Sequence, residues 1–417
     1  MNETSFLLND LNYYFTATFF YILSAIAYGV NLFYRDKLKQ ASRIFAILGL
    51  VIHSAGMTIR WLKAGEPILT SLFEMMLWFA WGAVIVMLII EIKFKYKPFG
   101  FFVMPLVIII MGIILLMPWR SAGATMPALQ SVWLYFHVAV AIVSYAAFLA
   151  GFSAAVMYFI KKNLRKDWFA FAASFYSTAV LLMINRFELI TKQSFDIYVR
   201  TSRGMQLADS LRGVGTILFF AFIFSLAASV LYILKLSSNN MENSLVSKLA
   251  QPVYILSTIS LLIGTAFLII KLISHPHLTI TSQPAETAFL MSCVIIGLFC
   301  LIVVSKYRSF QERIPKEDLL DSIQYYTVTI GFPFLTLTII TGAIWANKAW
   351  GSYWGNDPKE LAAAVTWLVY ATYLHMRITK GWRGIKAAII LAIGFVAVMF
   401  TLIGVTYLAP GGLHSYI

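Results

Sequence analysis

Long apolar runs, separated by short polar segments, are the main feature of the sequence. A helix needs about 20 predominantly apolar residues to cross the ~30 Å hydrocarbon core of a membrane, and twelve runs approach or reach that length. The runs are Tyr14–Phe33, Ile44–Ile59, Thr70–Ile90, Phe101–Met117, Val132–Ile160, Trp168–Ile184, Val214–Leu234, Val253–Ile273, Ala288–Val304, Tyr326–Trp345, Leu361–Met376 and Ala387–Tyr407. The pattern predicts an all-α fold, a polytopic transmembrane helix bundle of about 12 spans.

The composition supports a membrane protein and argues against other classes. Apolar residues make up 60% of the 417 residues and charged residues only 12%, a balance that a water-soluble protein of this length does not show. The formal net charge of +14 could also indicate a nucleic-acid-binding protein, but the Lys and Arg residues lie in short clusters between the apolar runs. We therefore expect basic rims at the surface of a lipid bilayer and no nucleic-acid partner.

Basic residues cluster in alternate loops, which predicts the orientation of the chain because Lys and Arg are retained on the cytoplasmic side. The basic loops contain Arg35, Lys37, Lys39 and Arg43; Lys93, Lys95 and Lys97; Lys161, Lys162, Arg165 and Lys166; Lys306, Arg308, Arg313 and Lys316; and Arg377, Lys380, Arg383 and Lys386. Both termini and the segments around Trp61, Trp119 and Trp350 are then extracytoplasmic.

One stretch fits this orientation poorly. The residues from Arg186 to Arg212 include five basic side chains and would be extracytoplasmic if the run Trp168–Ile184 crosses the membrane. If that run lay in the interface instead, every later span would be inverted and the basic loop near Arg377 would be outside. We favour the crossing.

The two cysteines, Cys293 and Cys300, lie within one apolar run and predict no disulfide framework. The sequence also lacks the Cys-x-x-Cys-His motif of covalent haem attachment. We therefore expect no covalently bound haem on this chain.

Aromatic rings are concentrated in the segment that follows the run Tyr326–Trp345. It reads Trp345-Ala-Asn-Lys-Ala-Trp350-Gly-Ser-Tyr353-Trp354-Gly-Asn-Asp357-Pro-Lys359-Glu360. An interfacial aromatic belt would explain one or two of these rings. The three Trp, one Tyr, two Gly and an Asp-Pro turn together predict a rigid, flat, aromatic-lined platform for a large planar ligand. Asp357 also has the features of a helix N-cap, with a proline at the first helical position and an acidic residue in the first turn.

Four of the six histidines lie at positions that suggest a role. His137 is near the extracytoplasmic start of its run and His414 follows the last run, so the two imidazoles could ligate a haem iron from its two faces. Alternatively, each is a polar anchor at the interface. His375 lies near the cytoplasmic end of its run. His53 is in mid-span, where an ionisable group suggests a function, although a bond to a neighbouring helix would also explain it.

Two cations, Arg60 and Lys63, are predicted near the extracytoplasmic mouth of the bundle. They could pair with the carboxylates of a ligand, such as haem propionates. They could equally hold the helix end in the headgroup layer.

Together these motifs resemble the CcsA/ResC branch of the tryptophan-rich WWD haem-handling proteins, the membrane synthetases of System II cytochrome c biogenesis. The resemblance is carried by Gly331-Phe-Pro-Phe, Thr341-Gly-Ala-Ile-Trp345-Ala, Trp350-Gly-Ser-Tyr-Trp354, Asp357-Pro-Lys-Glu360, Trp367-Leu-Val-Tyr370 with Leu374-His375, and Leu413-His414-Ser, and more loosely by His137 with Ser144-Tyr145 and by Gly56 to Glu74. The combined pattern is specific for this family, whereas each motif taken alone is not.

The resemblance implies haem b as the substrate, with its iron bound by histidine. His137 and His414 would be the extracytoplasmic ligands, and His375 would take part in haem passage. His53 is a further candidate for haem binding. The residues expected to cradle the haem are Trp345, Trp350, Tyr353, Trp354 and Asp357. No catalytic side chain is implied.

The implied function is haem transport and covalent attachment to apocytochrome c on the extracytoplasmic (periplasmic) side of the bacterial cytoplasmic (inner) membrane. The chain would act with a CcsB/ResB-like partner subunit. Two alternatives remain. One is a haem exporter or chaperone without attachment activity, and the other is a membrane anchor of a respiratory assembly that holds permanent b-type haems.

The sequence also departs from the family pattern. Asn356 stands where the family commonly has a tryptophan, and Leu361-Ala-Ala-Ala replaces a Thr-Trp-Ala stretch. The family core has about eight spans, whereas Trp168–Val304 here adds four. We therefore predict three parts: a five-span part at 1–167, an inserted four-span region at 168–320, and a three-span part with the WWD-like loop at 321–417.

Overall fold

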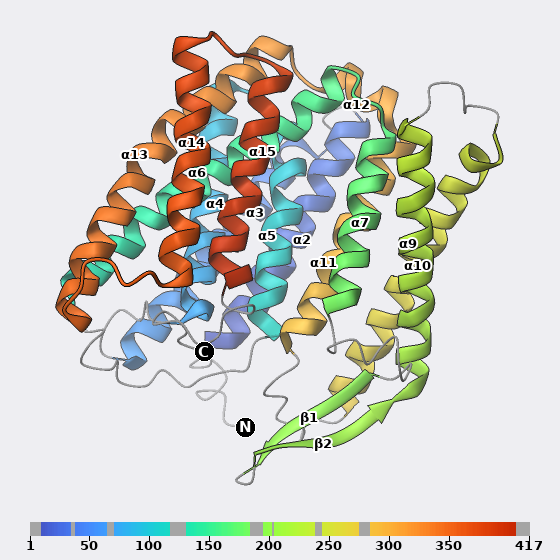
Figure 1. Ribbon diagram of the computed structural model, residues 1–417, viewed down its shortest axis with the longest axis horizontal. Helices are drawn as coiled ribbons and strands as arrows, with labels where there is room; N and C mark the ends of the chain where they lie inside the picture. Colours follow the sequence, from blue (N-terminus) through green and yellow to red (C-terminus); the bar gives the residue numbers. More distant parts are fainter. Residues whose placement is uncertain are drawn as a thin grey trace. The chain divides into compact units, whose positions relative to one another are not determined.

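The computed structural model describes residues 10–34, 38–64, 71–116, 131–183, 195–201, 204–237, 244–274 and 284–405. Helices form along all twelve predicted runs, which confirms the all-α polytopic bundle (Figure 1). Within these ranges, nine helices are long and apolar enough to cross a membrane. Of the other predicted spans, α5 (Gly100–Leu116) and α7 (Asp167–Met183) are shorter apolar helices, and α14 (Pro358–Thr379) is a longer helix with more polar residues.

The chain divides into two compact units. The first contains residues 1–114, 120–162 and 312–417, and the second contains residues 115–119 and 163–311. The other helices of the first unit are α2 (Asp10–Tyr34), α3 (Lys39–Ala64), α4 (Leu72–Phe94), η1 (Lys97–Phe99), α6 (Val132–Lys161), α13 (Glu317–Trp350), α15 (Ile385–Met399) and the π-helical η4 (Phe400–Gly404). That residues 168–320 are an insertion into an eight-span core stays a prediction, as does the orientation in the membrane.

In its described residues, the second unit combines helices with a β-hairpin. Its elements are α7, β1 (Phe195–Thr201), β2 (Gly204–Leu211), α9 (Arg212–Ser237), α10 (Leu245–Ser274) and α11 (Pro284–Ser305), and the short α12 (Tyr307–Arg313) follows. The hairpin is an addition to the predicted all-α fold, since this stretch was expected to be a loop. Its strands pair antiparallel with Phe195 opposite Leu211, and both of these side chains are buried. The run Ile197-Tyr-Val favours a strand because β-branched and aromatic residues fit a pleated surface.

Helix α6 packs against α4, α13 and α15 in the first unit (Figure 1). Its contacts with the antiparallel α13 recur at every seventh residue, starting from His137. Ser144 Oγ donates a hydrogen bond of 2.9 Å to the carbonyl oxygen of Gly331. Seven residues further along, a Cβ atom at Gly151 would lie 2.6 Å from Thr327 Oγ1, so the glycine permits the close approach of the two helices.

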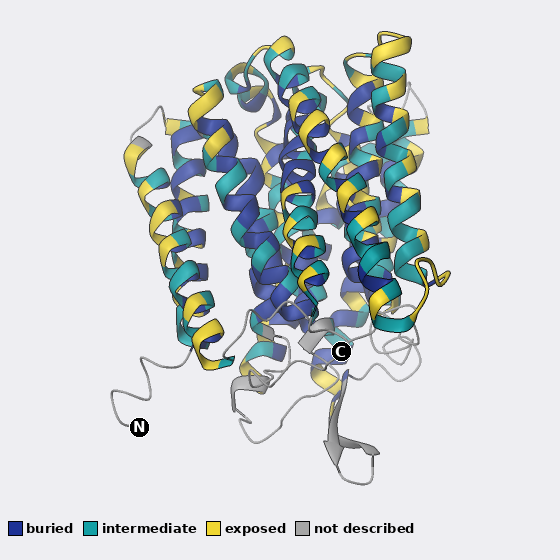
Figure 2. Ribbon diagram, turned by 90° about the vertical axis from the view of Figure 1, so that its left-hand side faces the viewer, coloured by how far each residue is buried: buried dark blue, intermediate teal, exposed yellow. Residues whose placement is uncertain are grey.

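Buried and exposed faces alternate around the helices (Figure 2). In α2, Tyr14, Tyr21 and Tyr28 are fully buried at seven-residue intervals, whereas Phe19 and Ile26 are 57% and 58% exposed. Large apolar side chains exposed along one face of an apolar helix indicate a surface that contacts lipid.

Candidate functional site

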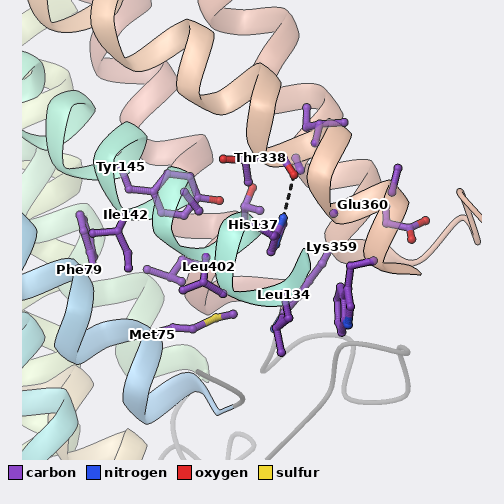
Figure 3. A pocket seen from close by; sticks show the side chains of 18 of the residues that line it. Met75, Phe79, Leu134, His137, Ile142, Tyr145, Thr338, Lys359, Glu360 and Leu402 are labelled. Atoms are coloured by element: carbon purple, nitrogen blue, oxygen red, sulfur yellow. Dashed lines mark hydrogen bonds between the residues drawn. The ribbon is translucent and has the colours of Figure 1, made fainter. Parts of the chain in front are cut away.

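A cavity of about 150 Å³ lies in the first unit where α4, α6, α13 and the start of α14 meet (Figure 3). Side chains such as Leu72, Phe79 and Ile142 make most of its wall apolar. The groups that can hydrogen-bond or carry charge are His137, Tyr145, Thr338, Trp345, Tyr353, Trp354, Lys359, Glu360 and Thr401. An apolar cavity with a few polar groups is typical of a ligand-binding site. We refer to it as the His137 cavity.

The imidazole of His137 is held in one orientation by α13. Its Nδ1 atom lies 2.8 Å from the carbonyl oxygen of Thr338, and its ring stacks on Trp345 with a centroid distance of 6.1 Å and an interplanar angle of 25°. A carbonyl oxygen can only accept a hydrogen bond, so Nδ1 carries the proton. In the neutral ring, Nε2 then carries the lone pair, which is the arrangement that metal-ligating histidines usually have.

Gly342 provides the space for this imidazole. A Cβ atom at this position would lie 2.7 Å from His137 Nδ1 and 2.8 Å from Cε1. Any larger residue would therefore force the ring away from the carbonyl of Thr338. The glycine of the Thr341-Gly motif therefore leaves room for the imidazole of His137 on the neighbouring helix α6.

The predicted aromatic platform is divided between a helix and a loop. Helix α13 continues to Trp350, beyond the predicted end at Trp345, and it ends at Gly351, whose φ of 77° lies in the left-handed region. Trp345 is 2% exposed and meets Trp350 edge to face, with ring centroids 5.0 Å apart and planes at 67°. The expectation of one flat surface is therefore wrong for this pair, because helical geometry turns the two rings relative to each other.

The loop that follows α13 contributes the other two rings. Tyr353 and Trp354 line the cavity and are 60% and 40% exposed. The Trp354 indole N–H donates to Asn356 Oδ1 at 3.0 Å, and Asn356 has a φ of 53°. Asparagine tolerates this left-handed conformation better than a bulky residue does. The residue in which this sequence departs from the family pattern therefore both forms the turn and orients Trp354.

Asp357 begins α14 as predicted. Its carboxylate accepts from the backbone N–H of Lys359 at 2.9 Å, and the Glu360 carboxylate accepts from the backbone N–H groups of Asp357 and Gly355. This capping box confirms the N-cap prediction. It also ties the loop that carries Trp354 to the first turn of α14.

Lys359 places an amine in the wall of the His137 cavity. It is half-buried and precedes the predicted span at 361–376. Burial lowers the pKa of its ammonium group, and the nearby carboxylate of Asp357 opposes that effect.

Two of the other predicted histidines, His375 and His53, do not line this cavity. His375 is exposed and lies on α14, about 25 Å along the helix axis from Pro358. His53 is fully buried on α3, with its Nδ1 atom 3.2 Å from Tyr21 Oη of α2. This is the bond to a neighbouring helix that the sequence left open as an alternative. His414 lies outside the described residues.

Arg60 and Lys63 pair with carboxylates of the protein itself. The Arg60 guanidinium is 5% exposed, donates through Nε and Nη2 to Glu74, and lies 3.3 Å from Asp10 Oδ2. Lys63 Nζ lies 3.2 Å from Asp10 Oδ1. Neither cation lines the His137 cavity. The structure therefore gives no support to the idea that Arg60 or Lys63 binds haem propionates at this cavity.

Several residues of the cavity were not singled out from the sequence. Gly342, Tyr145 and Lys359 lie within the motifs that carry the family resemblance, and that resemblance was the signal for them. Thr338 contributes its backbone carbonyl to His137. A backbone acceptor gives no side-chain signal, so only the structure could identify it.

Comparison with known proteins agrees with this architecture. Residues 69–413 match the family model described as "Cytochrome C assembly protein". The protein called cytochrome c biogenesis protein CcsA from Synechocystis sp. is 30% identical over 96% of this chain and 95% of its own length. CcsA from Microcystis aeruginosa is 31% identical over 89% and 85% of the two chains. These matches show that the chain belongs to the cytochrome c assembly protein family, as a multi-pass membrane protein of the CcsA type with a role in cytochrome c maturation.

Proposed function

We propose that this protein binds haem b at the His137 cavity and presents it for covalent attachment to apocytochrome c on the extracytoplasmic side of the bacterial cytoplasmic membrane. One observation carries the proposal, namely the hydrogen bond between His137 Nδ1 and the Thr338 carbonyl beside an aromatic cavity. It leaves the lone pair of the neutral ring on Nε2, the atom that would bind iron.

The groups around the cavity suit an iron porphyrin. The imidazole is a haem ligand, and the rings of Trp345, Tyr353 and Trp354 suit a flat conjugated molecule. The volume of about 150 Å³ is below the roughly 300–1,000 Å³ of typical ligand pockets, so only an edge of the porphyrin would lie inside. The exposed parts of Tyr353 and Trp354 would cover more of the ring.

Two further groups complete the proposed site. The ammonium group of Lys359, in the same wall, would pair with one haem propionate. His414 is proposed as the second axial ligand on the basis of the family pattern.

Attachment requires positioning more than acid–base chemistry. Each cysteine thiol of the apocytochrome adds across one haem vinyl group, with sulfur bonding to one carbon and hydrogen to the other. No group leaves and no oxidant is consumed. The contribution of this chain would be to hold the ring so that the vinyl groups meet the incoming thiols. We therefore assign no catalytic residue, and we propose a CcsB/ResB-like subunit as partner and His375 as a residue of haem passage.

The haem content of the purified full-length protein tests the role of His137. His137→Ala should reduce bound haem to less than about a tenth of the wild-type content, because a tenfold change needs only ~1.4 kcal/mol of lost ligation. His137→Gly should behave similarly, and added imidazole should restore the Soret band. A full haem content and an unchanged spectrum in His137→Ala would contradict the proposal.

Coexpression separates attachment from haem export or chaperoning. The chain, its partner subunit and a reporter with one Cys-x-x-Cys-His motif would be produced together, and covalent haem on the reporter would be measured after denaturation. Covalent haem that depends on His137 supports attachment. Haem that is captured by the chain but never bound covalently to the reporter would support the chaperone alternative.

A further inference from the structure

A second cavity lies between α2, α3 and α4. Its volume is about 220 Å³, and it is lined by Tyr14, Ser54, Met57, Thr58, Arg60, Trp61, Glu74, Leu77, Trp78 and Trp81. Tyr14 comes from α2, the residues at 54–61 come from α3, and those at 74–81 come from α4. We refer to it as the Tyr14 cavity. It shares no lining residue with the His137 cavity.

The charged groups beside this cavity neutralise one another. Arg60 is paired with Glu74 and Asp10, and Lys63 is paired with Asp10. Two cations and two carboxylates leave no excess charge to attract an ion. Because burying an unmatched charge is costly, the occupant that fits this cavity is uncharged.

One hydrogen-bonding group in the wall has no protein partner within the described residues. The side chain of Tyr14 is completely buried, and its hydroxyl group forms no hydrogen bond there. A buried polar group without a partner costs about 1–3 kcal/mol. An occupant with a carbonyl or hydroxyl oxygen would recover that cost.

Three indole rings line this cavity. The rings of Trp78 and Trp81 meet edge to face, with centroids 5.5 Å apart. The Trp81 indole N–H donates to Ser54 Oγ at 2.9 Å, which fixes its orientation. Trp61 adds a third indole. Such walls suit an aromatic ring, and the volume of about 220 Å³ has room for one such ring.

The occupant can reach this cavity from the lipid. Thr58 and Trp61, which line it, are exposed on α3, and the exposed apolar residues Val51 and Leu62 lie on the same helix. A surface of this kind on a membrane helix contacts lipid. A ligand that dissolves in the membrane would therefore enter sideways between helices.

We propose that the Tyr14 cavity binds the head group of a membrane quinone, with one quinone oxygen accepting a hydrogen bond from Tyr14. Such a ligand is neutral, carries a six-membered ring with oxygen substituents, and dissolves in lipid. The proposal concerns binding alone and does not depend on haem at His137.

Helix α4 contributes a different set of residues to each of the two cavities. Leu72, Met75 and Phe79 line the His137 cavity, whereas Glu74, Leu77, Trp78 and Trp81 line the Tyr14 cavity. Because a helix turns once every 3.6 residues, these two sets of side chains project from α4 in different directions. A redox-active ring at Tyr14 would thus lie across a single helix from the His137 cavity.

A matched pair of variants tests the proposal. Tyr14→Phe removes the buried hydroxyl group of a residue that lines the cavity. Tyr21→Phe removes a hydroxyl group one heptad away on the same helix, which bonds to His53 and does not line the cavity. The full-length protein in nanodiscs of zwitterionic lipid would be titrated with decylubiquinone, and binding would be followed by quenching of tryptophan fluorescence.

Tyr14→Phe should weaken decylubiquinone binding about five- to tenfold, the effect of one lost hydrogen bond, whereas Tyr21→Phe should stay within about twofold of wild type. A photoreactive azidoquinone should label peptides within 54–61 or 74–81. Equal affinities for wild type and Tyr14→Phe, equal losses in both variants, or labelling confined to the His137 cavity would overturn the proposal. So would displacement of the quinone by phosphatidylglycerol, since a charged lipid headgroup would then be the occupant.

Trp61→Ala provides an independent variant should Tyr14→Phe fail to fold. Trp61 is 49% exposed, so its truncation leaves the bundle packing largely intact. We expect a similar loss of quinone affinity. Unchanged affinity in Trp61→Ala would decide against the proposal.

Discussion

The His137 cavity and the Tyr14 cavity are separated by one helix and are stabilised in different ways. At His137, a neutral hydrogen bond to a backbone carbonyl orients the key side chain. At Tyr14, a closed set of ion pairs among Arg60, Glu74, Asp10 and Lys63 supports the wall. The first arrangement depends on space and helix packing, and the second depends on charge balance.

The difference predicts which substitutions each cavity tolerates. A backbone acceptor cannot be mutated away, so the geometry at His137 is sensitive to bulk on α13 and insensitive to loss of any polar side chain there. Removal of one charge from a buried set of ion pairs destabilises the folded protein, because the oppositely charged partner is left buried without compensation.

Removal of Glu74 should have the largest effect and should act on the Tyr14 cavity. In Glu74→Ala, the buried guanidinium of Arg60 loses one carboxylate partner and keeps Asp10, which Lys63 shares. We expect a loss of about 3 kcal/mol in the free energy of unfolding, measured by denaturation of the purified protein in detergent. Glu317→Ala, which breaks an exposed pair with Lys162, serves as the control and should destabilise the protein much less, because water screens an exposed ion pair. Equal losses of unfolding free energy in Glu74→Ala and Glu317→Ala would contradict the claim that the Tyr14 cavity depends on its charge balance.

Added bulk at Gly342 should have an intermediate effect and should act on the His137 cavity. The new Cβ atom would meet the His137 ring at 2.7 Å, so Gly342→Ala should cost about 1–3 kcal/mol of stability through overpacking. It should also lower haem content about tenfold if His137 ligates haem. Gly213→Ala is the control, because a Cβ atom there meets nothing within 4 Å. Wild-type haem content in Gly342→Ala would show that the imidazole position does not matter.

The sequence predicted the elements of the first unit better than their contacts. Apolar runs determined the helices, and the Asp357-Pro-Lys-Glu motif determined the start of α14, because both depend on local interactions. The partner of His137 lies 201 residues away along the chain, and no periodicity encodes such a pairing. Helix α13 passed the predicted end at Trp345 because Ala-Asn-Lys-Ala continues a helix until Gly351 ends it in the left-handed region.

Replacement of Lys359 should have the smallest effect on stability, and its sign depends on pH. Burial lowers the pKa of this lysine below its ordinary 10.5, so the folded protein binds the proton less tightly than the unfolded chain does. The charged amine therefore disfavours folding below the lowered pKa, and this penalty disappears as the pH rises through the lowered pKa toward 10.5.

Lys359→Met should thus slightly raise the unfolding temperature at pH 7, and the gain should shrink at pH 10. Lys380→Met, at an exposed position, should change neither. If Lys359 pairs with a propionate, the same variant should bind haem about fivefold more weakly while being more stable. A gain in stability that is equal at both pH values would contradict the assignment of the penalty to the buried charge. Unchanged haem affinity in Lys359→Met would show that the Lys359 ammonium group does not bind a haem propionate.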